Sequence, residues 1–324
     1  MRTPKRMSGL ISRLRSSISA GAEPADGKGG RQVKQLVLIA GPLHGKAGLD
    51  AAICLKEDIG RCWPQAQVEL VNTASNERNL HEMKKMLVSE KLYPKAKMDE
   101  LCVAVLSFCL LPGVEYERVR RWASSLALEF AVYGNPSIRI LDDSEHPLDE
   151  MGVEQQSQWG KERACPPDCH VELRSVWMAP PLLGTPEGIQ ALSQVLETEY
   201  PAKTGESLVL VGHGSCYANG VYRELERAFH RAGRRDVFVG TLRDGSGGIQ
   251  EMIKRSGIRA VRLVPLMLAA GIHTVRDMAG TQSTSWKSQL EQAEFEVYPV
   301  VRGLAELTSV RNLFLRQLAR FMKE

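Results

Sequence analysis

Short apolar runs alternate along the chain with stretches of helical periodicity. The runs predict buried strands, and the periodic stretches predict amphipathic helices between them. This rhythm is typical of an α/β protein in which helices cover parallel sheets. The expected strands are Gln35–Ala40, Val68–Val71, Val103–Leu111 and Ser137–Leu141, followed by Leu208–Val211, Val237–Gly240, Ala260–Leu268 and Glu296–Val301.

Helices are expected in the gaps between these strands. The clearest lie at Ala47–Ile59 and Glu115–Phe130 and at the amphipathic end of the sequence, Ser309–Met322. Another helix begins after Thr185, which is a good N-cap residue and is followed by Pro186 at the first helical position.

The pattern of strands restarts near Ser207, which indicates an internal repeat. Leu36–Ile39 resembles Leu208–Val211, and Val103–Gly113 resembles Val261–Gly271. We therefore expect two similar halves, each with a four-stranded parallel sheet flanked by helices, and a cleft between them. Ligands of open α/β sheets bind beyond the carboxyl ends of the strands, so residues that follow a strand are the candidates for a site.

The chain divides into three segments. Residues 1–34 are expected to be a disordered basic arm, residues 35–205 the N-terminal half with an inserted loop at 142–177, and residues 206–324 the C-terminal half. The arm contains eight Lys and Arg residues but only two Asp and Glu residues. Because this excess of positive charge is larger than the net charge of the whole chain, +4, the remaining residues are slightly acidic. Residues 35–324 have no excess of positive charge that could bind nucleic acid, so we do not expect nucleic acid as a partner.

Composition and cysteine usage predict a cytoplasmic protein. Hydrophobic residues make up 43% of the chain and charged residues 25%, as in ordinary globular proteins. The longest nearly apolar run, Leu101–Pro112, is too short for a transmembrane helix, and no secretory signal is recognisable. The seven cysteines are odd in number and scattered, which favours reduced thiols.

Two histidines follow expected strands of the second half. His213 stands in Val-Gly-His-Gly-Ser, where Gly212 and Gly214 permit a tight turn and the close approach of a ligand. His273 ends the stretch Pro-Leu-Met-Leu-Ala-Ala-Gly-Ile-His, shortly after Gly271. Two imidazoles that face one cleft suit a divalent ion of cobalt, nickel, iron or zinc. Either histidine alone would more often be a hydrogen-bonded turn residue, but their shared position favours a metal site.

Four stretches carry a resemblance to a known family. They are Val-Gly-His-Gly-Ser (211–215), Pro-Leu-Met-Leu-Ala-Ala-Gly-Ile-His (265–273), Arg-Asp-Met-Ala (276–279) and Ser-Trp-Lys (285–287). In order and spacing they resemble the anaerobic cobalt chelatases, the CbiK-type sirohydrochlorin cobaltochelatases of cobalamin biosynthesis. In the first half, Ser107–Glu117 resembles the family's segment before its cleft helix.

The resemblance implies a two-halved chelatase fold and an enzyme, a lyase that inserts Co²⁺ into a tetrapyrrole without ATP. Co²⁺ would be a substrate held at the site, and no organic cofactor is expected. The family's metal-site histidines correspond to His213 and His273. Metal must be held by exchangeable ligands while two pyrrole N–H protons are accepted, and neutral imidazole or a carboxylate can accept them. The implied partners are a tetrapyrrole of the sirohydrochlorin class and a divalent metal, and a homo-oligomer is left open.

The sequence departs from the family at its third site residue. The resemblance places a family Glu at Arg243, a cation that can neither bind metal nor accept a proton. The neighbouring Asp244 is the expected substitute, and Arg243 can instead pair with substrate carboxylates. Glu115 follows Gly113 as His273 follows Gly271, so the repeat places Glu115 at the same cleft as a substrate-binding candidate, together with the backbone of Gly214 and Gly271.

Two functions from different classes remain open at this level. One is an active metallochelatase that uses His213, His273 and Asp244. The other is a degenerate chelatase-fold protein that binds tetrapyrrole or metal without inserting it, as a carrier or a sensor. The stretch Cys165-Pro-Pro-Asp-Cys169-His170 has the residue types of a metal site but not the usual spacing, so a solvated loop is expected there.

Overall fold

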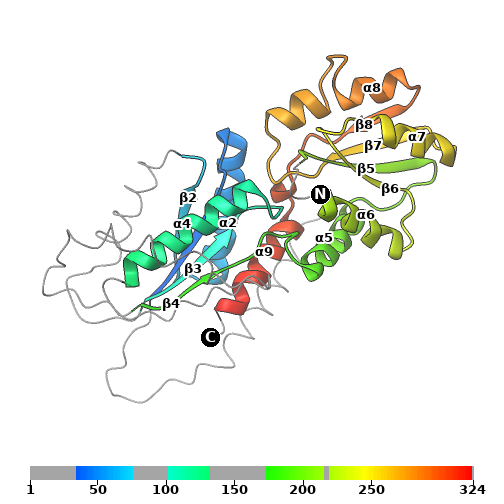
Figure 1. Ribbon diagram of the computed structural model, residues 1–324. Helices are drawn as coiled ribbons and strands as arrows, with labels where there is room; N and C mark the ends of the chain where they lie inside the picture. Colours follow the sequence, from blue (N-terminus) through cyan, green and yellow to red (C-terminus); the bar gives the residue numbers. More distant parts are fainter. Residues whose placement is uncertain (1–33, 76–100, 132–172, 215–218, 323–324) are drawn as a thin grey trace, which may run out of the picture.

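Two four-stranded parallel sheets form the fold, one in each half of the chain (Figure 1). The computed structural model describes residues 34–75, 101–131, 173–214 and 219–322. The first sheet has the strand order β2-β1-β3-β4 and the second the order β6-β5-β7-β8, so the two halves share one topology. Two similar halves, each a four-stranded parallel sheet flanked by helices, are therefore confirmed.

The elements of the first half are β1 (Lys34–Gly41), α2 (Gly45–Cys62), β2 (Gln67–Asn72), β3 (Leu101–Ser107), α4 (Val114–Ala131), β4 (Leu173–Met178) and α5 (Pro186–Glu199). Those of the second half are β5 (Glu206–Gly212), α6 (Asn219–Arg231), β6 (Val237–Thr241), α7 (Gly247–Ser256), β7 (Ala260–Pro265), η4 (His273–Met278), α8 (Trp286–Gln292), β8 (Glu296–Pro299), η5 (Leu304–Glu306) and α9 (Thr308–Phe321). The expected N-cap of α5 is confirmed, because the Gly188 amide donates to Thr185 Oγ1 at 3.1 Å.

Equivalent backbone hydrogen bonds mark the internal repeat. The Phe108 amide donates to the Ala40 carbonyl at 2.7 Å, and the Leu266 amide donates to the Val211 carbonyl at 2.8 Å. Phe108 and Leu266 correspond as the sequence match predicted. The match of Leu36 with Leu208 predicts that Ala40 corresponds to Gly212. In the structure Ala40 corresponds to Val211 instead. The register was wrong by a single position because buried parallel strands are apolar on both faces, so their sequences match almost equally well in neighbouring registers.

Helices cover both faces of each sheet. In the first half, α2 and α9 pack on one face, and α4 packs on the other face through Val119, Trp122 and Leu126. In the second half, α5 and α6 pack on one face, and α7 and α8 pack on the other. The sheet face covered by α2 and α9 in the first half and the sheet face covered by α5 and α6 in the second half share one continuous apolar core.

The last helix ties the two halves together. α9 follows the second sheet in the sequence, yet it packs beside α2 and β3 of the first half (Figure 1). In that interface Asp58 of α2 is 2% exposed, and its Oδ2 accepts a hydrogen bond from Arg311 Nε of α9 at 2.5 Å. Arg311 also donates to the carbonyls of Ala305 and Glu306, at 2.9 and 3.2 Å, so its guanidinium is well satisfied although buried.

The fourth strand of the first sheet lies elsewhere than the sequence pattern predicted. β4 occupies 173–178, at the end of the stretch expected to be an inserted loop (142–177), so that expectation was wrong for its last residues. Among the described strands β4 pairs with β3 alone and so forms an edge of the sheet, and an edge strand needs no continuous apolar run. The expected strand Ser137–Leu141 and the Cys165–His170 stretch lie outside the described residues, as does the basic arm apart from Lys34, which begins β1.

Two strands end earlier than their apolar runs. β3 ends at Ser107 and β7 at Pro265, whereas apolar residues continue to Leu111 and Leu268. The residues that follow each strand are still buried, for example Phe108 at 3% and Leu266 at 1% exposure, because both pack into the apolar core that also holds α9. No helix in the described parts of the chain is long and apolar enough to cross a membrane.

Candidate functional site

The first histidine of the site stands in a turn that only glycines allow. His213 directly follows β5, and it is exposed. A Cβ on Gly212 would lie 2.4 Å from the Tyr222 ring, and Gly214 has a φ of +93° with Arg243 Cβ 2.7 Å from where its own Cβ would be. The Gly214 amide donates to Tyr222 Oη at 3.2 Å, which anchors this turn to α6. Both flanking glycines are therefore required by close contacts.

The second histidine opens a short π-helical turn. His273 is the first residue of η4, and the Ala279 amide reaches back to the Thr274 carbonyl at 3.1 Å. Thr274 and Met278 anchor the turn, because both are fully buried. Single π-helical turns are rare and occur often at functional sites, where they redirect a side chain. Here the wide turn presents His273 at the carboxyl edge of the second sheet.

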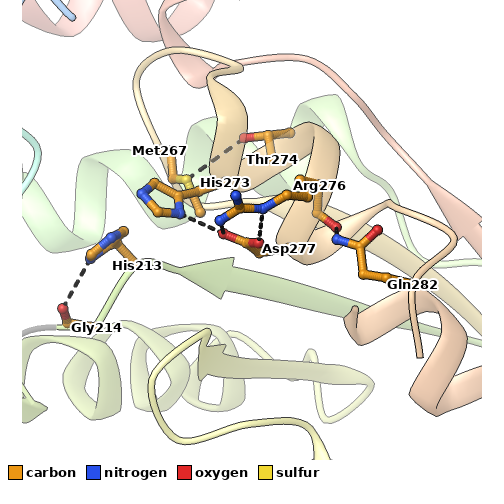
Figure 2. A network of polar contacts seen from close by, with 8 residues as sticks. All are labelled: His213, Gly214, Met267, His273, Thr274, Arg276, Asp277 and Gln282. Atoms are coloured by element: carbon orange, nitrogen blue, oxygen red, sulfur yellow. Dashed lines mark hydrogen bonds and ion pairs between the residues drawn. The ribbon is translucent and has the colours of Figure 1, made fainter. Parts of the chain in front are cut away.

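The structure brings the two histidines together (Figure 2). Their ring centroids are 4.5 Å apart and the ring planes form an angle of 77°, an edge-to-face arrangement. The two rings come from different elements, the end of β5 and the start of η4, so the strand order β6-β5-β7-β8 decides their proximity. Two adjacent imidazoles with an exposed side are an arrangement that a borderline divalent metal can bind.

A carboxylate lies behind the second histidine. His273 Nδ1 is 2.6 Å from Asp277 Oδ2, one helical turn along η4. Arg276 Nε donates to the other oxygen, Asp277 Oδ1, also at 2.6 Å. The Arg276 hydrogen bond is the main reason that the pKa of the Asp277 carboxyl lies below its usual value, and the contact with His273 lowers it further.

Asp244 does not join the histidines. Its Oδ2 accepts a hydrogen bond from Thr241 Oγ1 at 2.7 Å, and its amide donates to the same hydroxyl at 3.2 Å. Its charge acts on Tyr222, whose pKa is raised mainly by burial and slightly by Asp244. Within the described residues, no group of three His, Cys, Asp or Glu side chains is placed to hold a metal ion. Arg243 is exposed and lies beside Gly214, next to His213.

The candidate residue of the first half, Glu115, lies near a buried thiol. Glu115 lies in the first turn of α4 and corresponds to His273 in the register that pairs Phe108 with Leu266. Its Oε1 is 3.5 Å from Arg118, and its Oε2 is enclosed with no hydrogen-bond partner among the described residues. Burial raises the pKa of the Cys109 thiol to about 12, with a further contribution from the Glu115 charge and an opposing one from Ser107.

Gly271 leaves open space at the edge of the site. Nothing lies within 4 Å of the position that a Cβ would occupy there. Its carbonyl accepts hydrogen bonds from the amides of Thr274 and Val275, both at 3.1 Å, and so begins η4. A larger side chain at Gly271 would therefore enter free space next to His273 rather than clash with the protein.

Sequence reasoning missed two residues of this site, Tyr222 and Asp277. Asp277 stands one helical turn after His273, a spacing that places both on one side of the turn, so its signal was present in the stretch Arg-Asp-Met-Ala. Tyr222 carries no such signal, because its contact with Gly212 and Gly214 depends on how α6 packs against β5.

Comparison with known proteins gives a family match in the part of the chain that holds the histidines. Residues 168–323 match the family model "Cobalt chelatase (CbiK)". The chain is 33% identical over 144 residues to the sirohydrochlorin cobaltochelatase CbiKC of Nitratidesulfovibrio vulgaris, covering 43% of this chain and 50% of that protein. It is 30% identical over 152 residues to the sirohydrochlorin cobaltochelatase of Salmonella typhimurium, covering 43% and 53%. The matched part thus spans about half the length of these relatives.

Among solved structures, SirB from Bacillus subtilis with Fe³⁺ is similar with a TM-score of 0.48 and 14% identity, over 90% of this chain and 96% of that one. A chelatase-like multi-domain protein from Deinococcus radiodurans, DR2241, has a TM-score of 0.46 and 15% identity, over 90% and 55%.

Proposed function

From the match of residues 168–323 to the cobalt chelatase (CbiK) family model, we propose that the protein is a metallochelatase that inserts Co²⁺ into a tetrapyrrole of the sirohydrochlorin class. The observation that carries the proposal is the pair formed by His213 and His273, with ring centroids 4.5 Å apart at the carboxyl edge of the second sheet. This is the edge at which open α/β folds bind their ligands.

The histidine pair supplies what the reaction needs from the protein. Neutral imidazole nitrogens bind Co²⁺ and release it again, which a metal that is delivered to another ligand requires. Insertion places one Co²⁺ in the ring and displaces two protons from its pyrrole nitrogens, so the charge of the ring itself falls by two as the metal enters. A histidine that gives up the metal regains a free lone pair and can accept one of these protons.

Four further residues are proposed to bind the substrate or to make room for it. Arg243, exposed beside Gly214, faces solvent where it can donate two parallel hydrogen bonds to a peripheral carboxylate of the tetrapyrrole. Glu115 is the first-half counterpart of His273, and its partly exposed side chain is proposed to reach the substrate. The free space at Gly271 and the turn at Gly214 allow the ring to approach the backbone.

A degenerate protein that binds tetrapyrrole or metal without insertion is the second candidate. The observation that favours it is that no third metal-binding side chain joins His213 and His273 in the part of the chain that the structure describes. An insertion assay separates the two functions. Purified protein is mixed with sirohydrochlorin and Co²⁺, and the visible spectrum of the ring is followed against a protein-free control. Insertion faster than in the control supports the chelatase. If the protein shifts the spectrum of the metal-free tetrapyrrole but Co²⁺ enters at the uncatalysed rate, the protein is a binding protein.

Replacing Arg243 by Gln is expected to weaken substrate binding. The loss of an exposed Arg–carboxylate pair costs about 1 kcal/mol, which corresponds to a rise of about fivefold in the KM for sirohydrochlorin with little change in kcat. Steady-state kinetics at low and at high salt measure the effect, and the difference from the unaltered protein should shrink as salt screens the charges. An unchanged KM at low salt would remove Arg243 from the substrate-binding residues.

Replacing Asp244 by Asn tests whether this carboxylate substitutes for the family's Glu. Because Asp244 Oδ2 is bonded to Thr241 at 2.7 Å, we expect the Asn variant to keep its rate of insertion within about threefold, with Thr241 donating to the amide oxygen instead. The rate constant of insertion at saturating substrate is the quantity to measure. A loss of about 100-fold or more, on the scale of general acid–base catalysis, would instead place Asp244 among the proton acceptors.

A further inference from the structure

The two histidines of the pair have different partners at Nδ1. His273 Nδ1 is 2.6 Å from the carboxylate oxygen Oδ2 of Asp277. Among the described residues, the partner of His213 Nδ1 is the carbonyl oxygen of the next residue, Gly214, at 3.3 Å (Figure 2). A hydrogen bond to an ionised group is shorter and about twice as strong as one to a neutral group. His273 is therefore held firmly by the protein, whereas His213 is held loosely.

Arg276 fixes the role of Asp277 in this contact. Arg276 Nε donates to Asp277 Oδ1 at 2.6 Å, and a terminal nitrogen of Arg276 lies 3.2 Å from Oδ2. Arginine has only donors, so both carboxylate oxygens act as acceptors. The proton between Asp277 and His273 then belongs to Nδ1, and Nε2 of the neutral ring carries a lone pair on the side away from Asp277.

We propose that Asp277 is a positioning residue of the site, which fixes the Nδ1–H tautomer and the orientation of His273 so that its Nε2 lone pair is presented to the metal. The inference rests on the proposed function in assigning Co²⁺ as that metal. Carboxylates behind metal-binding histidines commonly act in this way, and their loss lowers metal affinity or activity by about 10- to 100-fold. Asp277 contacts Nδ1 of His273 and would therefore act on the reaction through this histidine.

The position of Arg276 makes Asp277→Asn an unusually direct test. The contact of Arg276 Nε with Oδ1, at 2.6 Å, is shorter than that of its terminal nitrogen with Oδ2, at 3.2 Å, so we expect the Asn oxygen to take the place of Oδ1 and the NH₂ group that of Oδ2. The terminal nitrogen of Arg276, whose side chain is exposed, then turns to solvent. That NH₂ group points at His273 Nδ1, which then has to accept a hydrogen bond. The proton moves to Nε2, where it blocks the lone pair. Asp277→Asn should thus invert the tautomer of His273 with almost no change of shape.

A second substitution should partly reverse this inversion. In the double variant Arg276→Met, Asp277→Asn, no guanidinium holds the amide oxygen, and the side chain can turn its oxygen toward His273 Nδ1. The Nδ1–H tautomer is then allowed again. A purely structural role of Asp277 predicts the opposite, because the double variant loses one more contact than the single one.

The experiment combines three measurements on the full chain. Long-range ¹H–¹⁵N NMR of metal-free protein with ¹⁵N-labelled histidine shows the tautomer of each imidazole ring. The signals of His273 are those that disappear in the variant His273→Gln. Titration with Co²⁺ followed in the visible region gives the metal affinity, and insertion kinetics give kcat and KM. Asp236→Asn is the matched control, since Asp236 is also held by an arginine, with Arg234 nitrogens 2.9 and 2.8 Å from its two oxygens.

The expected result is an Nδ1–H tautomer of His273 in the unaltered protein and an Nε2–H tautomer in Asp277→Asn. The variant should bind Co²⁺ about 10- to 100-fold more weakly and insert it with a lower kcat at unchanged KM for the tetrapyrrole. The double variant should recover part of both losses, and Asp236→Asn should change none of these quantities.

Two outcomes would overturn the inference. One is an unchanged His273 tautomer in Asp277→Asn, and the other is an unchanged Co²⁺ affinity despite an inverted tautomer. Failure of the proposed function looks different: the unaltered protein would then not insert Co²⁺, while the effect of Asp277 on tautomer and Co²⁺ affinity would persist and support the positioning role.

Discussion

Replacing either His213 or His273 by Ala is expected to slow Co²⁺ insertion by at least about 100-fold. Each substitution removes one of two metal ligands and one proton acceptor, and general acid–base contributions alone amount to about 100- to 10,000-fold. Because the rings are 4.5 Å apart and act on the same ion, the losses should not add, so the double variant should be about as slow as the worse single variant. Initial rates with saturating sirohydrochlorin measure the effect.

A matched control is His230→Gln. His230 lies on α6, and its Nε2 contacts the Val237 carbonyl at 3.0 Å, away from the histidine pair. The Gln side chain keeps a hydrogen-bond donor for that carbonyl, so insertion should proceed at the unaltered rate. Near-normal insertion by both His213→Ala and His273→Ala would refute the proposed site, even if the protein remained a chelatase.

Removing the buried carboxylate of Asp58 is expected to destabilise the protein by about 3–5 kcal/mol. Asp58→Ala leaves Arg311 without its carboxylate partner, and with neutral acceptors alone, in an interface where its side chain is 11% exposed, and a buried charge without a counter-charge carries a cost of this size. The free energy of unfolding, from urea titration followed by circular dichroism, is the quantity to compare. Because the pair joins α2 to α9, the unfolding transition should also become less cooperative between the halves.

Glu117→Ala is the comparison for Asp58→Ala. Glu117 forms an ion pair with Arg120 on α4 at 2.7 Å, but both side chains are substantially exposed, at 40% and 28%. Exposed pairs contribute up to about 1 kcal/mol, so this variant should unfold close to the unaltered protein. Equal free energies of unfolding for Asp58→Ala and Glu117→Ala would show that the buried pair does not hold the halves together.

Much of the fold was predictable because the apolar pattern reports burial directly. Strands such as Leu208–Val211 lie in the middle of a parallel sheet with helices on both faces, so their sequences are apolar without interruption. The same property limited the prediction, since an apolar run does not show where hydrogen bonding to the neighbouring strand ends. β3 and β7 stop before their apolar runs do. The edge strand β4 was missed because it has no such run.

The candidate histidines were also predictable, because glycine-flanked residues after buried strands stand where ligands bind. The sequence determined that His213 and His273 each follow a strand of the second half. Only the tertiary structure decided that their rings meet at 4.5 Å, since that depends on β5 and β7 being neighbours in the sheet.

The environment of each charged side chain was likewise decided by packing. From the sequence, Asp244 stood as near to the site as any carboxylate, and Asp277 had no role. In the folded chain Asp244 turns back to Thr241, while Asp277 lies behind His273. Sequence spacing fixes which residues can approach one another within a turn, but the direction of a side chain depends on the hydrogen-bond partners that the fold brings to it.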